Sequence, residues 1–166
     1  PARTGECHPH HQYDTFLRES WANYGIQHEE SYDFTACPRR RFFLVAAKQF
    51  GVAQLTATVA APPNPITGMA TNPSNSCSLR DAQTTHHFVA YITRCIKHFK
   101  FQGVVFTSVC PASAPHTGGV PGTVEGCRYT NNEFLQMVCM LSNELTRSGL
   151  QVRIVGPDVA SIDFLS

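Results

Sequence analysis

The chain has 166 residues, of which 42% are hydrophobic and 15% are charged, and its formal net charge is +1. This length favours one domain, residues 1–166, with a sizeable core. The nearly neutral charge does not favour a nucleic-acid partner, because nucleic-acid-binding domains usually carry a strongly basic surface. No run approaches the about 20 apolar residues of a membrane span, so we expect none.

The predicted elements alternate in a simple order after an irregular or helical amino-terminal segment, residues 1–37. Helices and strands take turns at about 39–50, 52–60, 82–102, 104–110, 131–148 and 150–156. Long loops follow the strands and short turns follow the helices, as in right-handed parallel βαβ units. The sequence therefore predicts an α/β fold, a partial (β/α) barrel, with residues 1–37 packed on an α/β core of residues 38–166.

Capping residues and apolar spacing set the limits and the buried faces of these helices. The expected boundary residues are Pro38, Asp81 and Thr130 or Asn131 at the starts, and Gly51, Gly103 and Gly149 at the ends. The expected buried residues are Phe42, Phe43, Ala46, Ala47 and Phe50 in the first helix, Phe88, Ile92, Cys95, Ile96 and Phe99 in the second, and Phe134, Val138, Leu141 and Leu145 in the third.

The strand at residues 104–110 leads directly into a loop bounded by two prolines. Its β-branched, apolar residues are typical of a strand buried on both faces of a parallel sheet. Pro111 ends it, because proline has no N–H to donate to the ladder, and Pro115 follows closely. Because α/β folds place their sites at the carboxyl ends of strands, we expect a site nearby. Residues 112–114 nevertheless offer one hydroxyl group and no charge.

Seven cysteines without a C-x-x-C pair favour disulfides in an oxidising compartment over a zinc site. The start at Pro1, without methionine, suggests a processed chain, so we expect a secreted protein. The expected pairs are Cys77 with Cys127, Cys7 with Cys37 and Cys95 with Cys139, which leaves Cys110 as a buried thiol.

A series of short motifs runs along most of the chain. They are Arg41–Lys48, Val59–Pro63, Phe88–Tyr91, Lys97–Phe99, Phe106–Pro111, Glu125–Cys127 and Gly156–Asp163. In this order they resemble the endo-β-1,6-galactanase branch of glycoside hydrolase family 30. Members of that branch are secreted (β/α) barrels that act on polysaccharides, and the resemblance covers about residues 32 to 163.

The resemblance implies that the family's catalytic acid/base is missing here. The family carries this glutamate in a Pro-x-Asn-Glu-Pro signature, and Ala114 of Ser113-Ala114-Pro115 stands at its position. Retaining hydrolysis needs two carboxyl groups about 5 Å apart, and alanine supplies none. The family's nucleophile is expected on a later strand, beyond the last residue. The expectation is a secreted, glycosidase-derived protein that acts as a glycan-binding, defence or toxic protein.

A rebuilt hydrolase is the alternative, either a glycosidase or a metal-dependent nuclease. Its acid/base groups would be Glu125, His116 and Asp158, all on the long-loop face. A basic run, Arg39–Arg41, could then hold a phosphate. The residues expected to bind a ligand are Asn64, Ser113, His116 and Glu125.

The amino-terminal histidines raise a metal hypothesis. His8, His10 and His11 could bind zinc, because imidazole is a common zinc ligand, with Cys7, Glu6 or a second group at His86 and His87 as further ligands. Their spacing matches no recognised motif, so the main expectation is no cofactor, with zinc as the alternative. A small parallel sheet also leaves unpaired edges, through which two copies could associate as a homodimer.

Overall fold

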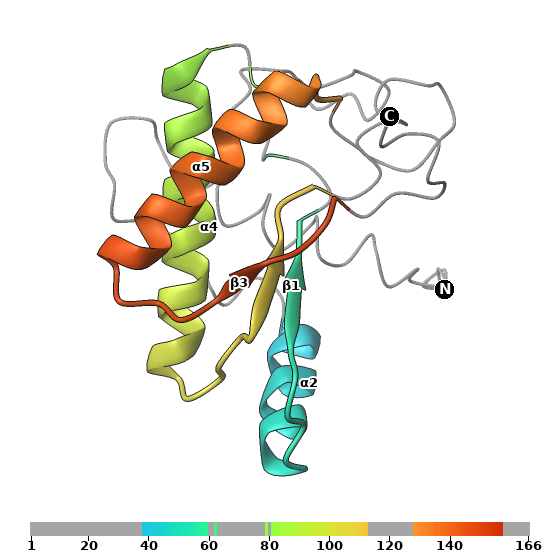
Figure 1. Cartoon of the computed structure of the whole chain (residues 1–166). Coiled ribbons are helices and arrows are strands. Elements are labelled where there is room, and N and C mark those ends of the chain that lie inside the picture. The colour runs from blue at the N-terminus through green and yellow to red at the C-terminus, as the bar shows by residue number, and fades with distance from the viewer. Residues whose placement is uncertain (1–37, 60–61, 63–78, 80, 113–127, 158–166) are drawn as a thin grey trace.

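The computed structural model describes residues 38–59, 62, 79, 81–112 and 128–157. In this part of the chain helices and strands alternate as α2 (Pro38–Gln49), β1 (Thr56–Thr58), α4 (Ala82–Phe101), β2 (Ser108–Cys110), α5 (Asn131–Arg147) and β3 (Arg153–Ile154) (Figure 1). The strands are parallel and lie in the order β1-β2-β3, so β2 is central. This confirms the predicted α/β fold. The predicted packing of residues 1–37 falls outside the described residues.

Side-chain caps start the two longer helices. The Asp81 carboxylate accepts a hydrogen bond of 2.6 Å from the Thr84 N–H at the start of α4. At the start of α5, Thr130 and Glu133 form a capping box: the Glu133 N–H donates to the Thr130 hydroxyl, and the Thr130 N–H donates to the Glu133 carboxylate. Both caps satisfy N–H groups that a helix start otherwise leaves unpaired. The structure therefore confirms Asp81 as a cap and selects Thr130 over Asn131.

None of the described helices is long and apolar enough to cross a membrane.

One turn geometry ends all three helices of the described residues. After α2, the Gly51 N–H donates to the Lys48 carbonyl and the Val52 N–H to the Ala47 carbonyl. The same pair of bonds recurs after α4 and after α5, which makes each a Schellman turn. The central glycine needs a positive φ in this turn, and the values are 68° at Gly51, 79° at Gly103 and 63° at Gly149.

The strands are shorter than the predicted 52–60, 104–110 and 150–156. Each begins later than predicted, because the N–H groups of Val52, Val104 and Leu150 bond to helix carbonyls and cannot join a ladder. Next to the ladder, a side chain joins β1 and β2: the Thr107 hydroxyl donates to the Leu55 carbonyl and accepts from the Leu55 N–H, at 3.1 and 3.2 Å.

Residues in register give the sheet two different faces. Ala57, Val109 and Ile154 share one row, and this row packs on the hydrophobic core with the helices. Thr56, Ser108 and Arg153 form the neighbouring row, which faces away from the helices because side chains alternate along a strand. The first two are joined by a hydrogen bond of 2.7 Å between their hydroxyl groups.

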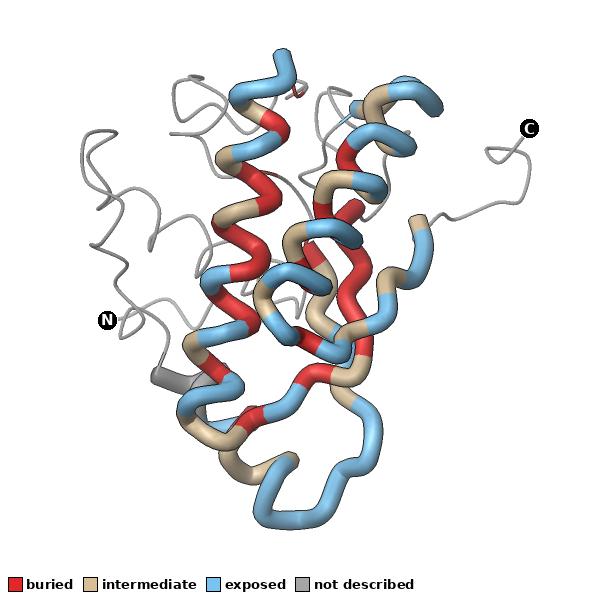
Figure 2. The backbone as a smooth tube through the Cα atoms, turned by 60° about the vertical axis from the view of Figure 1, so that its left-hand side comes forward, coloured by how far each residue is buried: buried red, intermediate tan, exposed pale blue. Residues whose placement is uncertain are grey.

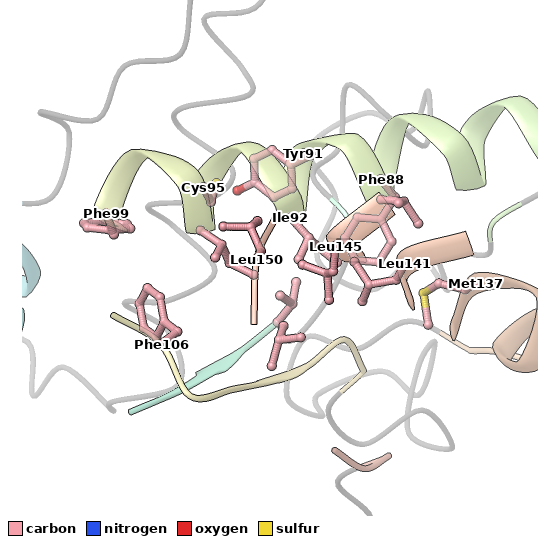
Figure 3. Packing of buried hydrophobic residues seen from close by; sticks show 14 of the residues in the cluster. Phe88, Tyr91, Ile92, Cys95, Phe99, Phe106, Met137, Leu141, Leu145 and Leu150 are labelled. Atoms are coloured by element: carbon pink, nitrogen blue, oxygen red, sulfur yellow. The ribbon is translucent and has the colours of Figure 1, made fainter. Parts of the chain in front are cut away.

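Helix α4 packs beside α5 and supplies more of the core residues than any other described element. All five residues predicted for its buried stripe are buried. Figure 2 shows the buried segments of this helix recurring along its length. In α5, Leu141 and Leu145 are buried as predicted and lie in the core cluster, together with Met137, which the predicted spacing did not include (Figure 3). Phe134 and Val138 are only half-buried.

The predicted face of the first helix is wrong. Phe42, Phe43 and Phe50 are exposed, and Leu44 is the α2 side chain that enters the core. Helical spacing shows that aromatic residues share a side, but it does not show whether another element covers that side.

Replacing Thr107 by valine should destabilise the fold. Valine keeps the shape of the threonine side chain but removes both of its hydrogen bonds to Leu55, and the Leu55 N–H loses this partner. We therefore expect a loss of about 1–3 kcal/mol in the free energy of unfolding. Urea denaturation followed by circular dichroism measures it. The matched control is Thr146→Val, which removes an exposed bond to the Ser142 carbonyl and should cost less than about 0.5 kcal/mol. Equal losses in the two variants would contradict the role given to Thr107.

Candidate functional site at the carboxyl edge of the sheet

The three strands end together at one edge, where α/β folds place their sites. Past the ladder, the Val59 N–H donates to the Cys110 carbonyl and the Val155 N–H to the Val109 carbonyl, both at 2.9 Å. These bonds hold the chain segments that leave β1 and β3 against the end of β2. The prolines that follow β1 and β2, Pro62 and Pro111, are fully buried, so both pack inside the protein at this edge.

The end of β2 is as poor in chemistry as its sequence predicts. Cys110 is buried, and its thiol donates to the Ala112 carbonyl at 3.3 Å. Ala112 is itself buried. The thiol therefore bonds within its own loop, and the described part of this strand end offers no titratable group besides it.

Both described carboxylates at this edge form helix caps. Hydrogen bonding from the Thr84 backbone lowers the pKa of Asp81, because the bond favours the charged form. Glu133 accepts hydrogen bonds of 2.7 and 2.9 Å from the Thr130 N–H and hydroxyl group. Neither group is available as an acid/base pair for hydrolysis.

The third carboxylate among the described residues, Glu144, lies near the other end of α5. Burial raises its pKa, but hydrogen bonding and the charge of Arg147, 2.6 Å away, outweigh burial and lower the pKa overall. It is paired and distant from the carboxyl edge.

The residues predicted for catalysis and ligand binding lie outside the described part of the chain. These are Asn64, Ser113, Ala114, His116, Glu125 and Asp158, together with the proposed metal ligands His8, His10 and His11. Their mutual distances therefore stay predictions. Within the described residues, no three His, Cys, Asp or Glu side chains are grouped as a metal ion requires. His86 and His87 are neighbours, with ring centroids 6.3 Å apart.

Sequence reasoning missed the polar row on the face of the sheet away from the helices. Thr56 and Ser108 are linked by their hydroxyl groups, and Thr58 lies one step closer to the carboxyl edge, in register with Cys110. The alternation in Thr56-Ala57-Thr58 is the signal that could have found it, because period-two polarity marks a strand with one polar face.

The predicted disulfide between Cys95 and Cys139 is wrong. Both residues are thiols: Cys95 is buried and Cys139 is exposed. The helices are neighbours, as expected, but Cys95 belongs to the α4 stripe that packs into the core, whereas Cys139 points to solvent. Desolvation by burial raises the pKa of Cys95 to about 12, so it stays protonated at neutral pH. The pairs proposed for Cys7 with Cys37 and Cys77 with Cys127 lie outside the described residues.

Parallel strands that end at a shared, proline-bounded edge, with helices on one face, define a partial (β/α) barrel. The chain belongs to O-glycosyl hydrolase family 30, whose family model matches residues 13–166. This confirms the resemblance seen in the sequence. A comparison with curated proteins finds no match.

Two solved structures share the fold. A conserved exported protein from Bacteroides fragilis has a TM-score of 0.70 at 20% identity, over 81% of this chain and 28% of that protein. The glycoside hydrolase family 30 subfamily 8 xylanase from Clostridium acetobutylicum has a TM-score of 0.60 at 19% identity, over 88% of this chain and 38% of the xylanase. The chain thus spans well under half the length of either protein.

Thiol labelling should separate the cysteines of α4 and α5. We expect iodoacetamide to modify Cys139 in the native protein and Cys95 only after unfolding, because Cys95 is buried and protonated. Peptide mass spectrometry under native and denaturing conditions reads out both sites. A peptide pair joined through Cys95 and Cys139 would contradict the structure.

Proposed function

We propose that this protein is a secreted, glycosidase-derived protein that binds a glycan at the carboxyl edge of its sheet and does not carry out the family's retaining hydrolysis. A defence or toxic role would rest on that binding. Family membership supports a glycan as the ligand class. Its fold neighbour from Bacteroides fragilis is an exported protein, which supports secretion, as does the number of cysteines.

The observation that carries the proposal is the end of β2. This central strand runs into Pro111 and Ala112, both buried, and the next residues in sequence are Ser113, Ala114 and Pro115. In the family resemblance, Ala114 stands where the catalytic glutamate is expected. Because a methyl group cannot protonate a leaving oxygen, the retaining mechanism lacks its general acid.

The described carboxylates do not replace that acid. Asp81 and Glu133, at the same edge, are held in caps, so a substitute would have to come from loop residues such as Glu125 or Asp158. The rebuilt hydrolase, with His116 as a further candidate, is the competing function that the experiment must exclude.

Binding and turnover should be measured on the same samples, with β-1,6-galactan and β-1,3-glucan oligosaccharides. We expect binding by calorimetry without release of new reducing ends. His116→Ala and Glu125→Gln should each weaken binding about tenfold or more, because the first removes a hydrogen-bond partner of the sugar and the second replaces a charge-assisted hydrogen bond by a weaker neutral one. Thr146→Val, on the exposed side of α5, is the control and should bind like the parent protein.

Two results would overturn the proposal. Turnover that disappears in Glu125→Gln or His116→Ala would establish the rebuilt hydrolase. Absence of binding to both glycans, with a correctly folded protein, would overturn the proposed glycan binding at this edge.

A further inference from the structure

An apolar surface lies at the end of the molecule opposite the carboxyl edge. We define the aromatic end as Phe50, Val52, Phe101 and Val105, which come from the α2–β1 and α4–β2 turns. Phe50 is 86% exposed and Phe101 is 93% exposed. Single exposed apolar side chains are common on protein surfaces, but a group of them on one surface often marks an interaction site.

The two turns are neighbours. The strands that they enter pair in register, Thr56 with Ser108, so equivalent positions in the turns lie side by side. The Lys48 side chain at the end of α2 also lies against Gly103 in the second turn. Figure 1 shows both turns at the lower end of the molecule, and the first of them is an exposed stretch of chain at the bottom of Figure 2.

The turn geometry does not require these phenylalanines. The same Schellman turn occurs three times, and the last helical residue is Gln49 in α2, Phe101 in α4 and Arg147 in α5. At the next position the residues are Phe50, Gln102 and Ser148. Each phenylalanine thus occupies a position where the other two turns have a polar residue.

Val52 is also more exposed than the residues at the equivalent position of the other two turns. It is 49% exposed, whereas Val104 and Leu150, at the same position in the other turns, are buried in the core. The aromatic end therefore carries more exposed apolar surface than its own fold needs.

Basic side chains lie at the same end of the molecule. Lys48, Lys97, Lys100 and Arg147 lie in or near the last turns of the three described helices, and Arg153 begins β3. The Lys100 ammonium donates an exposed hydrogen bond of 3.2 Å to the Gly149 carbonyl. Of the described carboxylates, only Glu144 lies at this end, and it is paired with Arg147. The other two cap helix starts at the opposite edge. Cations at helix ends also complement the helix dipole, but that role gives no reason for the exposed phenylalanines beside them.

We propose that the aromatic end binds an anionic lipid bilayer, with Phe50 and Phe101 inserted at the level of the head groups and the basic side chains against the lipid phosphates. Proteins that bind at a membrane surface bury apolar side chains among the lipids and hold anionic head groups with lysine and arginine, and this end of the molecule offers both kinds of side chain. A second copy of the chain is less well matched, because two such surfaces would bring like charges together. This orientation turns the carboxyl edge of the sheet away from the bilayer.

Vesicle flotation tests the proposal with the whole chain. We expect binding to vesicles in which about a third of the lipid is phosphatidylserine, weaker binding to pure phosphatidylcholine, and release at high salt. The double variant Phe50→Gln, Phe101→Gln takes the residue types found in the equivalent turns, so its unfolding midpoint should not change. Its partition coefficient should fall about tenfold or more. Lys97→Gln should lower it about fivefold.

The matched control is Leu135→Gln, which removes an exposed apolar residue, 59% accessible, near the other end of α5. It should leave partitioning unchanged. No binding to the anionic vesicles would overturn the proposal, and so would an equal loss in the Leu135 control. Self-association by light scattering that is lost in the double phenylalanine variant, without lipid binding, would assign the surface to a second copy instead.

Discussion

The packing of α4 on the central strand is the interaction on which the rest of the structure depends. Phe99 of α4 and Phe106, which comes just before β2, meet edge to face, with ring centroids 5.9 Å apart, and Val109 of β2 belongs to the same hydrophobic core. Because β1 and β3 both pair with β2, fixing this strand against α4 fixes the whole sheet. It also defines the two ends of the molecule, the carboxyl edge where the strands finish and the aromatic end where the helices turn back.

The sequence predicted the features that depend on local chemistry. The α4 stripe repeats at helical spacing and is long enough to be unambiguous, and the caps and glycines that bound the helices are satisfied by neighbours within a few residues. The predicted strand limits were less accurate. Apolar residues just after each helix were predicted to begin a strand, but their N–H groups bond to helix carbonyls in the Schellman turns.

Predictions that depended on which surfaces meet were the weakest. The aromatic face of α2 has helical spacing but is exposed, and Cys95 and Cys139 sit on neighbouring helices but point in different directions. For the candidate site, the two prolines, Pro111 and Pro115, predicted where β2 ends, and the small residues 112–114 between them predicted a loop without charged groups. The arrangement of Glu125, His116 and Asp158 depends on long loops, for which neither periodicity nor capping gives distances.

The central claim is that a family 30 strand end has kept its architecture while losing its acid, and that it now holds a glycan without cleaving it. A crystal structure of the protein soaked with β-1,6-galactan oligosaccharides tests this most directly. We expect an intact oligosaccharide at the carboxyl edge, beside the loop that follows β2, with no covalent bond to the protein. A shortened sugar, or a glycosyl group bonded to a side chain, would contradict it.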